Sequence, residues 1–168
     1  MVLMDKNKIR YPDTKAYAFV VKRLSELGVS LSDMADIAYQ LEYKYIPTLT
    51  INECLTAVIT VMHKRDILNL AMTGLELDRL AQDNLIKEPL LSIIRNDLGV
   101  FAVDEVLGVS ISQLYGLIGV SSFGMVDKVK TGIIKDLDTD DNRINTFVDD
   151  LVGAIASATA AKVTHDNS

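Results

Sequence analysis

The fold of this chain is decided by the stretch Val148-Asp-Asp-Leu-Val-Gly-Ala-Ile-Ala-Ser157. The stretch is informative because a related copy of it occurs earlier in the chain. The copy, Val103-Asp-Glu-Val-Leu-Gly-Val-Ser-Ile-Ser112, is identical to it at four of ten positions. Each copy consists of an acidic pair followed by an uncharged run with helical spacing and one glycine. Since the pattern occurs only twice, it predicts two related helices and not a solenoid.

Two properties place these helices in the core of the protein. Behind the acids, both are apolar on nearly every face, which is typical of buried helices. Gly108 and Gly153 follow the acids by about one turn, and a glycine inside a helix costs roughly 1 kcal/mol relative to alanine. A common reason for such a glycine is the close approach of another helix. The two glycine-bearing faces are therefore candidates for such a contact with each other.

The rest of the chain also has helical patterns. Capping boxes at Ser30–Asp33 and Thr50–Glu53 begin two helices, and a break is expected near Thr73-Gly74. Apolar residues do not alternate as in strands, and the sequence has no Asn-Gly or Asp-Gly hairpin turn. The sequence predicts an all-α fold, a single compact multi-helix domain over residues 1–168 with about seven or eight helices. The later helices are expected at about 103–118, 125–137 and 146–162.

Composition and charge exclude several classes of protein. Of 168 residues, 49% are hydrophobic, so a sizeable core is available and global disorder is excluded. The net charge of −6 argues against a general binder of nucleic acids or anionic membranes, which needs a positive field. One cysteine, Cys54, and two histidines argue against disulfides and against a zinc site. Residues 1–10 lack the apolar stretch of a signal peptide, so a cytoplasmic protein is expected.

Residues 106–126 carry no charge over 21 positions, which is long enough to span a bilayer. The run nevertheless contains four glycines and four serines and lacks the dense Leu, Ile and Phe content of membrane helices. We predict a buried helix followed by a Gly/Ser loop at 119–124, and no transmembrane span. Apolar helices outside a membrane also lead to the hypothesis of a homodimer.

If the two glycine faces meet, four carboxylates converge, those of Asp104, Glu105, Asp149 and Asp150. Carboxylates placed in this way repel one another and resist ionisation unless a cation neutralises them. Hard oxygen ligands in this number suit Mg²⁺ or Mn²⁺. The spacing leaves open the alternative that the four acids only cap exposed helix starts and never meet.

A further group of acids, Asp136–Asp141, begins like the calcium-binding loop of an EF-hand. The match fails where that loop needs a glycine, which is Asp141 here, and where it needs a glutamate, which is Phe147 here. The segment is therefore expected to be a solvated acidic loop. Just before it, Lys128 and Lys130 are placed to contact a phosphate, the alternative being an exposed charged face.

Three motifs in order resemble the phosphatidylglycerophosphatase A family. They are Asp104-Glu105-x-x-Gly108, Asp127-x-x-Lys130 and Asp149-Asp150-x-x-Gly153-Ala-x-Ala156. The resemblance is closest to the soluble branch of the family in Gram-positive bacteria, which is related to the low-temperature-requirement C protein, and for that branch it covers nearly the whole chain. One motif alone would be a weak signal, but the three in order are specific.

The resemblance implies a Mg²⁺- or Mn²⁺-dependent phosphatase that converts phosphatidylglycerophosphate to phosphatidylglycerol. Without membrane-spanning helices, such an enzyme would meet its lipid peripherally at the inner face of the membrane, or would act on a soluble phosphomonoester. The residue roles that the resemblance implies are catalysis by Glu105, Asp149 and Asp127, metal binding by Asp104, Glu105, Asp149 and Asp150, and phosphate binding by Lys130 and Lys128.

Three departures from the family pattern keep other functions open. Lys130 is followed by Thr131 where the family has proline, and the family's Pro-Gly-Thr-x-Gly segment is missing apart from Thr73-Gly74. The family's membrane-spanning helices are also absent, although residues 106–126 would be their counterpart. One alternative is a non-catalytic helical module that keeps the carboxylates as a cation clamp. Another is an all-α nucleotide pyrophosphohydrolase, although the Glu-x-x-Glu and Glu-x-x-Asp patterns of that class do not occur in this sequence.

Overall fold

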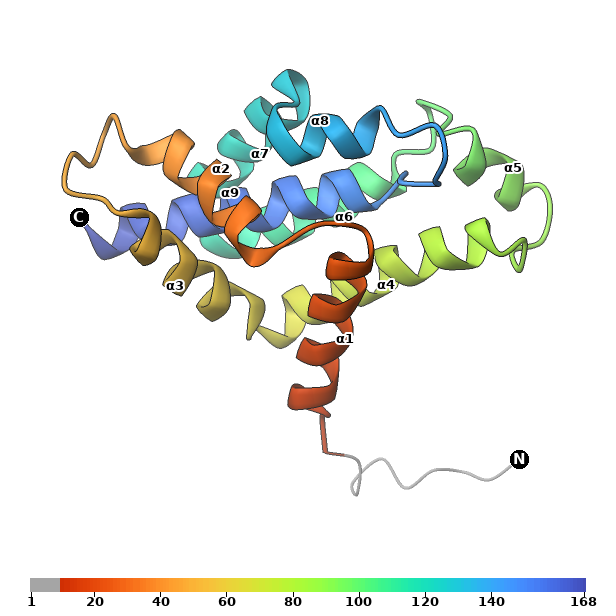
Figure 1. Cartoon of the computed structure of the whole chain (residues 1–168), viewed down its shortest axis with the longest axis horizontal. Helices are drawn as coiled ribbons and strands as arrows, with labels where there is room; N and C mark the ends of the chain where they lie inside the picture. Colours follow the sequence, from red (N-terminus) through yellow and green to blue (C-terminus); the bar gives the residue numbers. More distant parts are fainter. Residues whose placement is uncertain (1–9) are drawn as a thin grey trace.

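The computed structural model describes residues 10–168, and within them the chain forms nine α-helices, a short 3-10 helix and no strand (Figure 1). This confirms the all-α prediction. The helix count exceeds the expected seven or eight because residues 103–138 form three α-helices where two were expected. The helices are α1 (Asp13–Glu26), α2 (Leu31–Glu42), α3 (Ile51–Met62), α4 (Arg65–Gln82), α5 (Leu90–Arg95), α6 (Val103–Ser112), the 3-10 helix η2 (Gln113–Tyr115), α7 (Leu117–Val129), α8 (Gly132–Asp138) and α9 (Val148–Asp166).

Helix α9 forms the centre of the molecule, as the sequence of its first ten residues predicts. It runs lengthwise through the fold (Figure 1), and 15 of its 19 residues are buried. Helices α2, α3, α4, α6, α7 and α8 all pack against it. Its buried Ser157 and Thr159 hydroxyls donate to carbonyl oxygens one turn earlier in the same helix, so these polar groups are satisfied inside the core.

The expected break at Thr73-Gly74 is wrong, because α4 continues through both residues. Gly74 is instead a packing glycine. A Cβ atom there would lie 2.8 Å from Leu151 Cδ1 and 3.2 Å from Phe147 Cβ. The missing side chain therefore lets α4 lie directly against the start of α9.

The two glycines of the repeat pack against a third helix. A Cβ atom on Gly108 would lie 2.4 Å from Phe123 Cζ, and one on Gly153 would lie 3.2 Å from Val126 Cγ1 and 3.7 Å from Phe123 Cε2. Helices α6 and α9 do contact each other. The space that their glycines leave is filled by Phe123 of α7, so the two glycine faces contact this ring and not each other.

The uncharged run at 106–126 forms most of α6, η2 and most of α7, so the expected Gly/Ser loop at 119–124 is also wrong. Gly116, with φ +82°, separates η2 from α7. Gly119 brings α7 close to the preceding helix, because a Cβ atom there would lie 2.3 Å from the Ser112 carbonyl oxygen. None of the helices between residues 10 and 168 combines the length and apolar character that crossing a bilayer requires.

Two glycines of α7 should respond in opposite ways to alanine. Gly119→Ala should destabilise the protein by about 1–3 kcal/mol, because the new methyl group meets backbone that cannot move aside. Gly124→Ala has no atom within 4 Å of the new Cβ and should stabilise it by up to about 1 kcal/mol through helix propensity. Chemical denaturation of both variants measures the difference, and equal effects would contradict the helical assignment of residues 119–124.

Candidate active site

The acids of the repeat lie in the first turns of α6 and α9, and the packing of these helices brings them into one region. Asp104, Asp149 and Asp150 are buried, with only 7%, 7% and 6% of their surface exposed. Around them lie further carboxylates whose charges act on one another. This acidic cluster consists of Asp97, Asp104, Glu105, Asp127, Asp138, Asp149 and Asp150.

Lys130 supplies positive charge inside the acidic cluster. Its Nζ atom lies 2.6 Å from Asp138 Oδ1, 3.0 Å from Asp149 Oδ2 and 4.0 Å from Asp127 Oδ1. Burial lowers the pKa of Lys130, but its hydrogen bonds to Asp138 and Asp149 outweigh burial and raise it. The lysine therefore stays charged and joins three carboxylates that come from α7, α8 and α9.

Burial makes the other carboxylates difficult to ionise. The pKa of Asp150 rises to about 9, mainly through burial and then through the charges of Asp149, Asp127 and Asp104. The pKa of Asp104 rises to about 7, through burial and through the adjoining Glu105 carboxylate. Such shifts are typical of functional sites, where charge is kept despite its cost to stability.

Strained backbone conformations occur in and next to the acidic cluster. Four residues other than glycine have positive φ within residues 10–168, and three of them border or belong to the acidic cluster. They are Asp97 (φ 44°), Ala102 (φ 59°) just before α6, and Lys130 (φ 40°) after α7. Each conformation costs on the order of 1 kcal/mol or more and is kept where the surroundings enforce it.

The start of α9 is held by a carboxylate from a distant part of the sequence. The backbone N–H groups of Phe147 and Val148 both donate to Asp78 Oδ2 of α4 at 3.0 Å. Neither Phe147 nor any nearby side chain of α9 caps this helix start. Asp78 is 2% exposed, and burial raises its pKa well above the usual value despite the two hydrogen bonds that lower it. Through these hydrogen bonds, Asp78 fixes the position of the first turn of α9, which carries Asp149 and Asp150.

The cluster has the donor chemistry of a site for a hard cation, but its ligands are not gathered around one point. Among residues 10–168, no three acidic, histidine or cysteine side chains lie close enough together to hold a metal ion. Two buried oxygens, Asp104 Oδ1 and Glu105 Oε2, nevertheless have no hydrogen-bond partner. Buried carboxylate oxygens without a donor are atoms that a divalent cation would satisfy, so the donor chemistry of these residues, though not their spacing in this structure, suits a hard divalent cation.

A polar cavity of about 210 Å³ adjoins the cluster, between α5, α8 and the loop that precedes α9. Asp138 and Asp149 line one part of it, while Arg95 and Arg143 line another. Arg143 Nε lies 3.9 Å from Asp140, and Arg95 donates to Asn84. Asp97, Asp140 and Asp141 also line this cavity, so its lining contains five acids and two arginines.

The structure places the two predicted phosphate-binding lysines differently. Lys130 lies inside the cluster, whereas Lys128 is exposed and forms no ion pair within the described part of the chain. The acidic segment is also not one solvated loop. Asp136 and Asp138 belong to α8, and Asp138 pairs with Lys130, while Asp140 and Asp141 follow the helix.

Four residues of the site were not assigned to it from the sequence. Asp97 and Asp138 join the acidic cluster, and Arg95 and Arg143 line the adjoining cavity. All four lie in or next to loops outside the repeat. Only the closeness of Asp138 to the Asp127-x-x-Lys130 motif, eight residues after the lysine, offered a hint.

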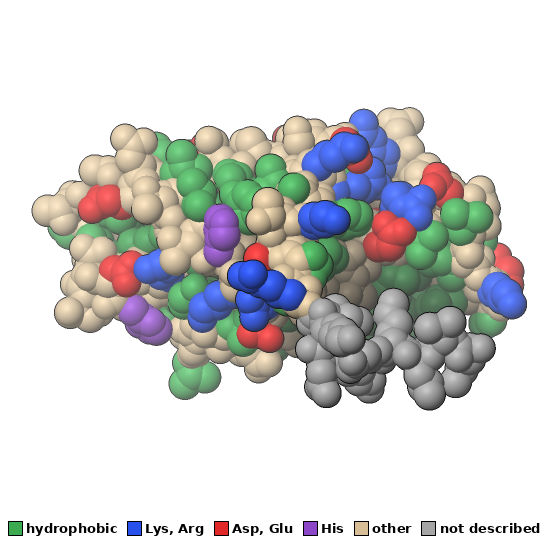
Figure 2. All heavy atoms as spheres, turned by 90° about the horizontal axis from the view of Figure 1, so that it is seen from below, with side chains coloured by type: hydrophobic (Ala, Val, Ile, Leu, Met, Phe, Trp, Pro, Cys, Tyr) green, Lys and Arg blue, Asp and Glu red, His purple; other side chains and the backbone are tan. Residues whose placement is uncertain are grey.

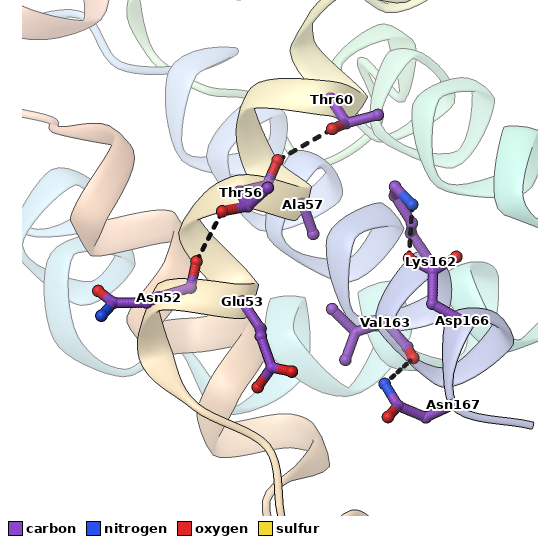
Figure 3. A pocket seen from close by; sticks show the side chains of 9 residues that line it. All are labelled: Asn52, Glu53, Thr56, Ala57, Thr60, Lys162, Val163, Asp166 and Asn167. Atoms are coloured by element: carbon purple, nitrogen blue, oxygen red, sulfur yellow. Dashed lines mark hydrogen bonds and ion pairs between the residues drawn. The ribbon is translucent and has the colours of Figure 1, made fainter.

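A second cavity lies at the other end of α9, between that helix and α3 (Figure 3). Its polar groups are already used within their own helices: Thr56 and Thr60 donate to carbonyl oxygens of α3, and Lys162 pairs with Asp166. Figure 3 shows these contacts along the two helices, with no group of carboxylates comparable to the acidic cluster. This cavity is therefore the weaker candidate for a catalytic site.

The face seen from below in Figure 1 presents its charges in small mixed groups. Figure 2 shows lysine and arginine side chains there in separate patches, several of them beside acidic side chains. The part of this face that is drawn in colour shows no continuous basic surface for a polyanion.

Comparison with known proteins identifies the family. Residues 37–165, which include the acidic cluster, match the model of the phosphatidylglycerophosphatase A family. The chain belongs to this family. The predicted resemblance is thus confirmed, and the matched segment contains all three motifs on which it rested.

The relatives are Gram-positive proteins of similar length. The uncharacterised protein YutG of Bacillus subtilis is 43% identical over 144 residues, which cover 85% of this chain and 87% of YutG. A solved protein of unknown function from Bacillus stearothermophilus is 42% identical with a TM-score of 0.87, over 90% of this chain and 99% of that one. The low temperature requirement C protein of Listeria monocytogenes is 38% identical with a TM-score of 0.85, over 92% and 96%.

Removal of the Asp78 carboxylate should weaken the start of α9. Asp78→Ala leaves two buried N–H groups without an acceptor and should destabilise the protein by about 1–3 kcal/mol. Asp78→Asn keeps one acceptor oxygen and should cost less. Glu76→Ala, which removes only a partly exposed pair with Arg79 on the same helix, is the control and should change little. Urea denaturation compares the three, and an equal effect of Asp78→Ala and Glu76→Ala would contradict the capping role.

The buried acids predict an unusual dependence of stability on pH. A folded-state pKa of about 9 for Asp150, above its usual value of 3.8, means that the native state keeps a proton that the unfolded state has released. Without divalent cations, the free energy of unfolding should therefore fall as pH rises from about 4 to about 9. Asp150→Asn should be more stable than the unsubstituted protein at neutral and alkaline pH, with a melting temperature higher by several degrees. Thermal unfolding at pH 5, 7 and 9 tests this, and a parallel decline in both proteins would contradict it.

Proposed function

We propose that this protein is a metal-dependent phosphatase that hydrolyses a phosphomonoester, with phosphatidylglycerophosphate as the preferred substrate and phosphatidylglycerol as the product. The observation that carries the proposal is that the acidic pairs at the starts of α6 and α9 lie in one region, where Lys130 pairs with Asp149 and two carboxylate oxygens of the α6 pair lack partners. Membership of the phosphatidylglycerophosphatase A family supports the phosphatase class and the phospholipid substrate.

Metal binding is assigned in this proposal to Asp104 and Glu105 of α6 and Asp149 and Asp150 of α9. A bound Mg²⁺ or Mn²⁺ would neutralise the cluster, polarise the phosphoryl group and favour a hydroxide nucleophile near neutral pH. Glu105 and Asp149, together with Asp127, are the proposed catalytic carboxylates. The overall reaction adds water across the phosphorus–oxygen bond and releases the alcohol and inorganic phosphate.

Positive side chains supply the remaining recognition of phosphate. The cluster by itself repels a phosphomonoester, so the substrate needs cationic groups from the chain as well as the metal. Lys130 is the proposed phosphate ligand, because its ammonium group already lies among the carboxylates, and exposed Lys128 is a secondary one. Arg95 and Arg143 line the cavity through which the rest of the head group would approach.

The departure from the family at Thr131 is compatible with this role. The family's proline would restrict the turn after the lysine. In this chain, Lys130 has a left-handed backbone conformation, and its side chain pairs with Asp138 and Asp149. Two contacts at 2.6 and 3.0 Å can restrain the side chain that the proline would have restrained through the backbone.

Release of inorganic phosphate in the presence and absence of Mg²⁺ tests the proposed function. Phosphatidylglycerophosphate in mixed micelles and glycerol 3-phosphate should be compared side by side, with the lipid expected to react faster. Glu105→Ala and Asp149→Ala should each lower phosphate release by at least about 100-fold, since each removes a carboxylate on which the site depends. Asp136→Ala, an exposed acid of α8 outside the cluster, should retain activity.

Circular dichroism should show that all three variants keep their helical content. Full activity of Glu105→Ala and Asp149→Ala would contradict the site assignment. Stabilisation by Mg²⁺ without turnover of any phosphomonoester would indicate the non-catalytic module instead. Release of pyrophosphate from a nucleoside triphosphate would indicate the pyrophosphohydrolase.

A further inference from the structure

The Asp149 carboxylate is needed by two different positive groups. Its Oδ2 atom accepts a hydrogen bond from Lys130 Nζ at 3.0 Å, whereas the proposed function assigns the same carboxylate to a divalent cation. Only 7% of Asp149 is exposed, so solvent screens positive charges beside it weakly and they repel each other. The ammonium group of Lys130 and a divalent cation therefore compete for this carboxylate.

Lys130 ties Asp149 to one side of the acidic cluster. The same ammonium group binds Asp138 of α8. The two carboxylate oxygens without a hydrogen-bond partner, on Asp104 and Glu105, belong instead to α6. In the part of the chain that the structure describes, no three acidic side chains gather closely enough to hold a metal ion. A cation shared between the α6 pair and Asp149 would need the oxygen that the lysine holds.

Asp138 offers the lysine a second place to bind. Its Oδ1 atom lies 2.6 Å from Lys130 Nζ, closer than the Asp149 oxygen at 3.0 Å. The Asp138 side chain is 35% exposed and the Asp149 side chain 8%, so Asp138 lies nearer the surface, and both line the polar cavity of about 210 Å³. A small rotation of the lysine side chain toward the surface therefore breaks the inner hydrogen bond and keeps the outer one.

Such a rotation also releases hydrogen-bond donors of the lysine. An ammonium group has three N–H donors, and Lys130 uses two of them in its hydrogen bonds to Asp138 and Asp149. When only the bond to Asp138 is kept, two donors are available for the oxygens of a phosphate group. Asp138 then holds the flexible lysine next to Asp149 and keeps its ammonium group from moving out into solvent.

We propose that Lys130 and a divalent cation exchange at Asp149, with Asp138 as the positioning residue that holds the displaced ammonium group. This inference rests on the proposed function and extends it to the way in which the acidic cluster admits its cation. The lysine competes with the cation before the exchange and serves as the phosphate ligand after it. Asp138 contacts neither the phosphate nor the cation and acts only through Lys130.

Binding of Mn²⁺, followed by electron paramagnetic resonance of the free ion, tests the exchange without turnover. Lys130→Met removes the competing charge and should raise the affinity for Mn²⁺ at least about 10-fold, because two positive charges at one carboxylate repel each other strongly. Lys135→Met is the matched control, since it removes an exposed lysine of α8, and should change the affinity by less than about twofold. Circular dichroism establishes that the variants are folded, and Lys130→Gln replaces Lys130→Met if the latter loses helical content.

A double-mutant cycle separates the exchange from simple repulsion between charges. Asp138→Asn should lower the affinity for Mn²⁺ at least about 10-fold when Lys130 is present, because the lysine is then left with Asp149 as its partner. In the Lys130→Met background the same substitution should lower the affinity by less than about threefold. Asp136→Asn, which removes an exposed acid of the same helix, should have an equally small effect in both backgrounds. Asp138→Glu keeps the carboxylate and should restore most of the affinity.

Equal Mn²⁺ affinity of Lys130→Met and the unsubstituted protein would overturn the exchange. Equal effects of Asp138→Asn in both backgrounds would show that Asp138 acts on the cation directly and would overturn its positioning role. Absence of Mn²⁺ binding in all of these proteins would overturn the exchange together with the metal dependence of the proposed function.

The other outcomes separate the exchange from the phosphatase. Mg²⁺-dependent phosphate release, with a Mn²⁺ affinity that Lys130→Met does not change, would overturn the exchange and leave the phosphatase intact. Coupling between Lys130 and Asp138 in Mn²⁺ binding, without phosphate release from any ester, would retain the exchange and overturn the phosphatase.

Discussion

The two hydrogen bonds from the start of α9 to the buried Asp78 carboxylate are the contact on which the arrangement of the site depends. Helix α9 is the element against which most other helices pack, and its first turn carries Asp149 and Asp150. The contact joins residues about 70 positions apart and lies next to Gly74, which lets α4 approach closely. A buried carboxylate is costly unless donors satisfy it, and here the free N–H groups of a helix start do so.

The same arrangement concentrates features that destabilise the folded state at the acidic cluster. Buried acids of like charge raise one another's pKa, and strained backbone at Asp97, Ala102 and Lys130 borders them. Lys130 offsets part of the repulsion by pairing with Asp138 and Asp149. A core built only for stability would bury aliphatic side chains at these positions. The persistence of charge there is what a site for a cation and a phosphate group requires.

Several features of the fold could be predicted because they depend on local pattern. The capping boxes at Ser30 and Thr50 form as expected, and the apolar run after Asp150 is the buried central helix. The predictions for glycine were less successful. Gly74 and residues 119–124 lie within helices, and Gly108 and Gly153 make room for Phe123. A glycine can end a helix or admit a neighbour, and only the position of that neighbour distinguishes the two.

The sequence by itself determined the helical class, the placement of an acidic pair in the first turn of α6 and of α9, and the family to which the chain belongs. These depend on residue spacing along one helix or on motif order. Tertiary structure alone decided that Asp78 caps α9, that Asp138 pairs with Lys130, and that an apolar groove forms between α2, α7 and α8. The physical reason is that burial, electrostatic fields and cavities arise from groups that packing brings together across long separations in the chain.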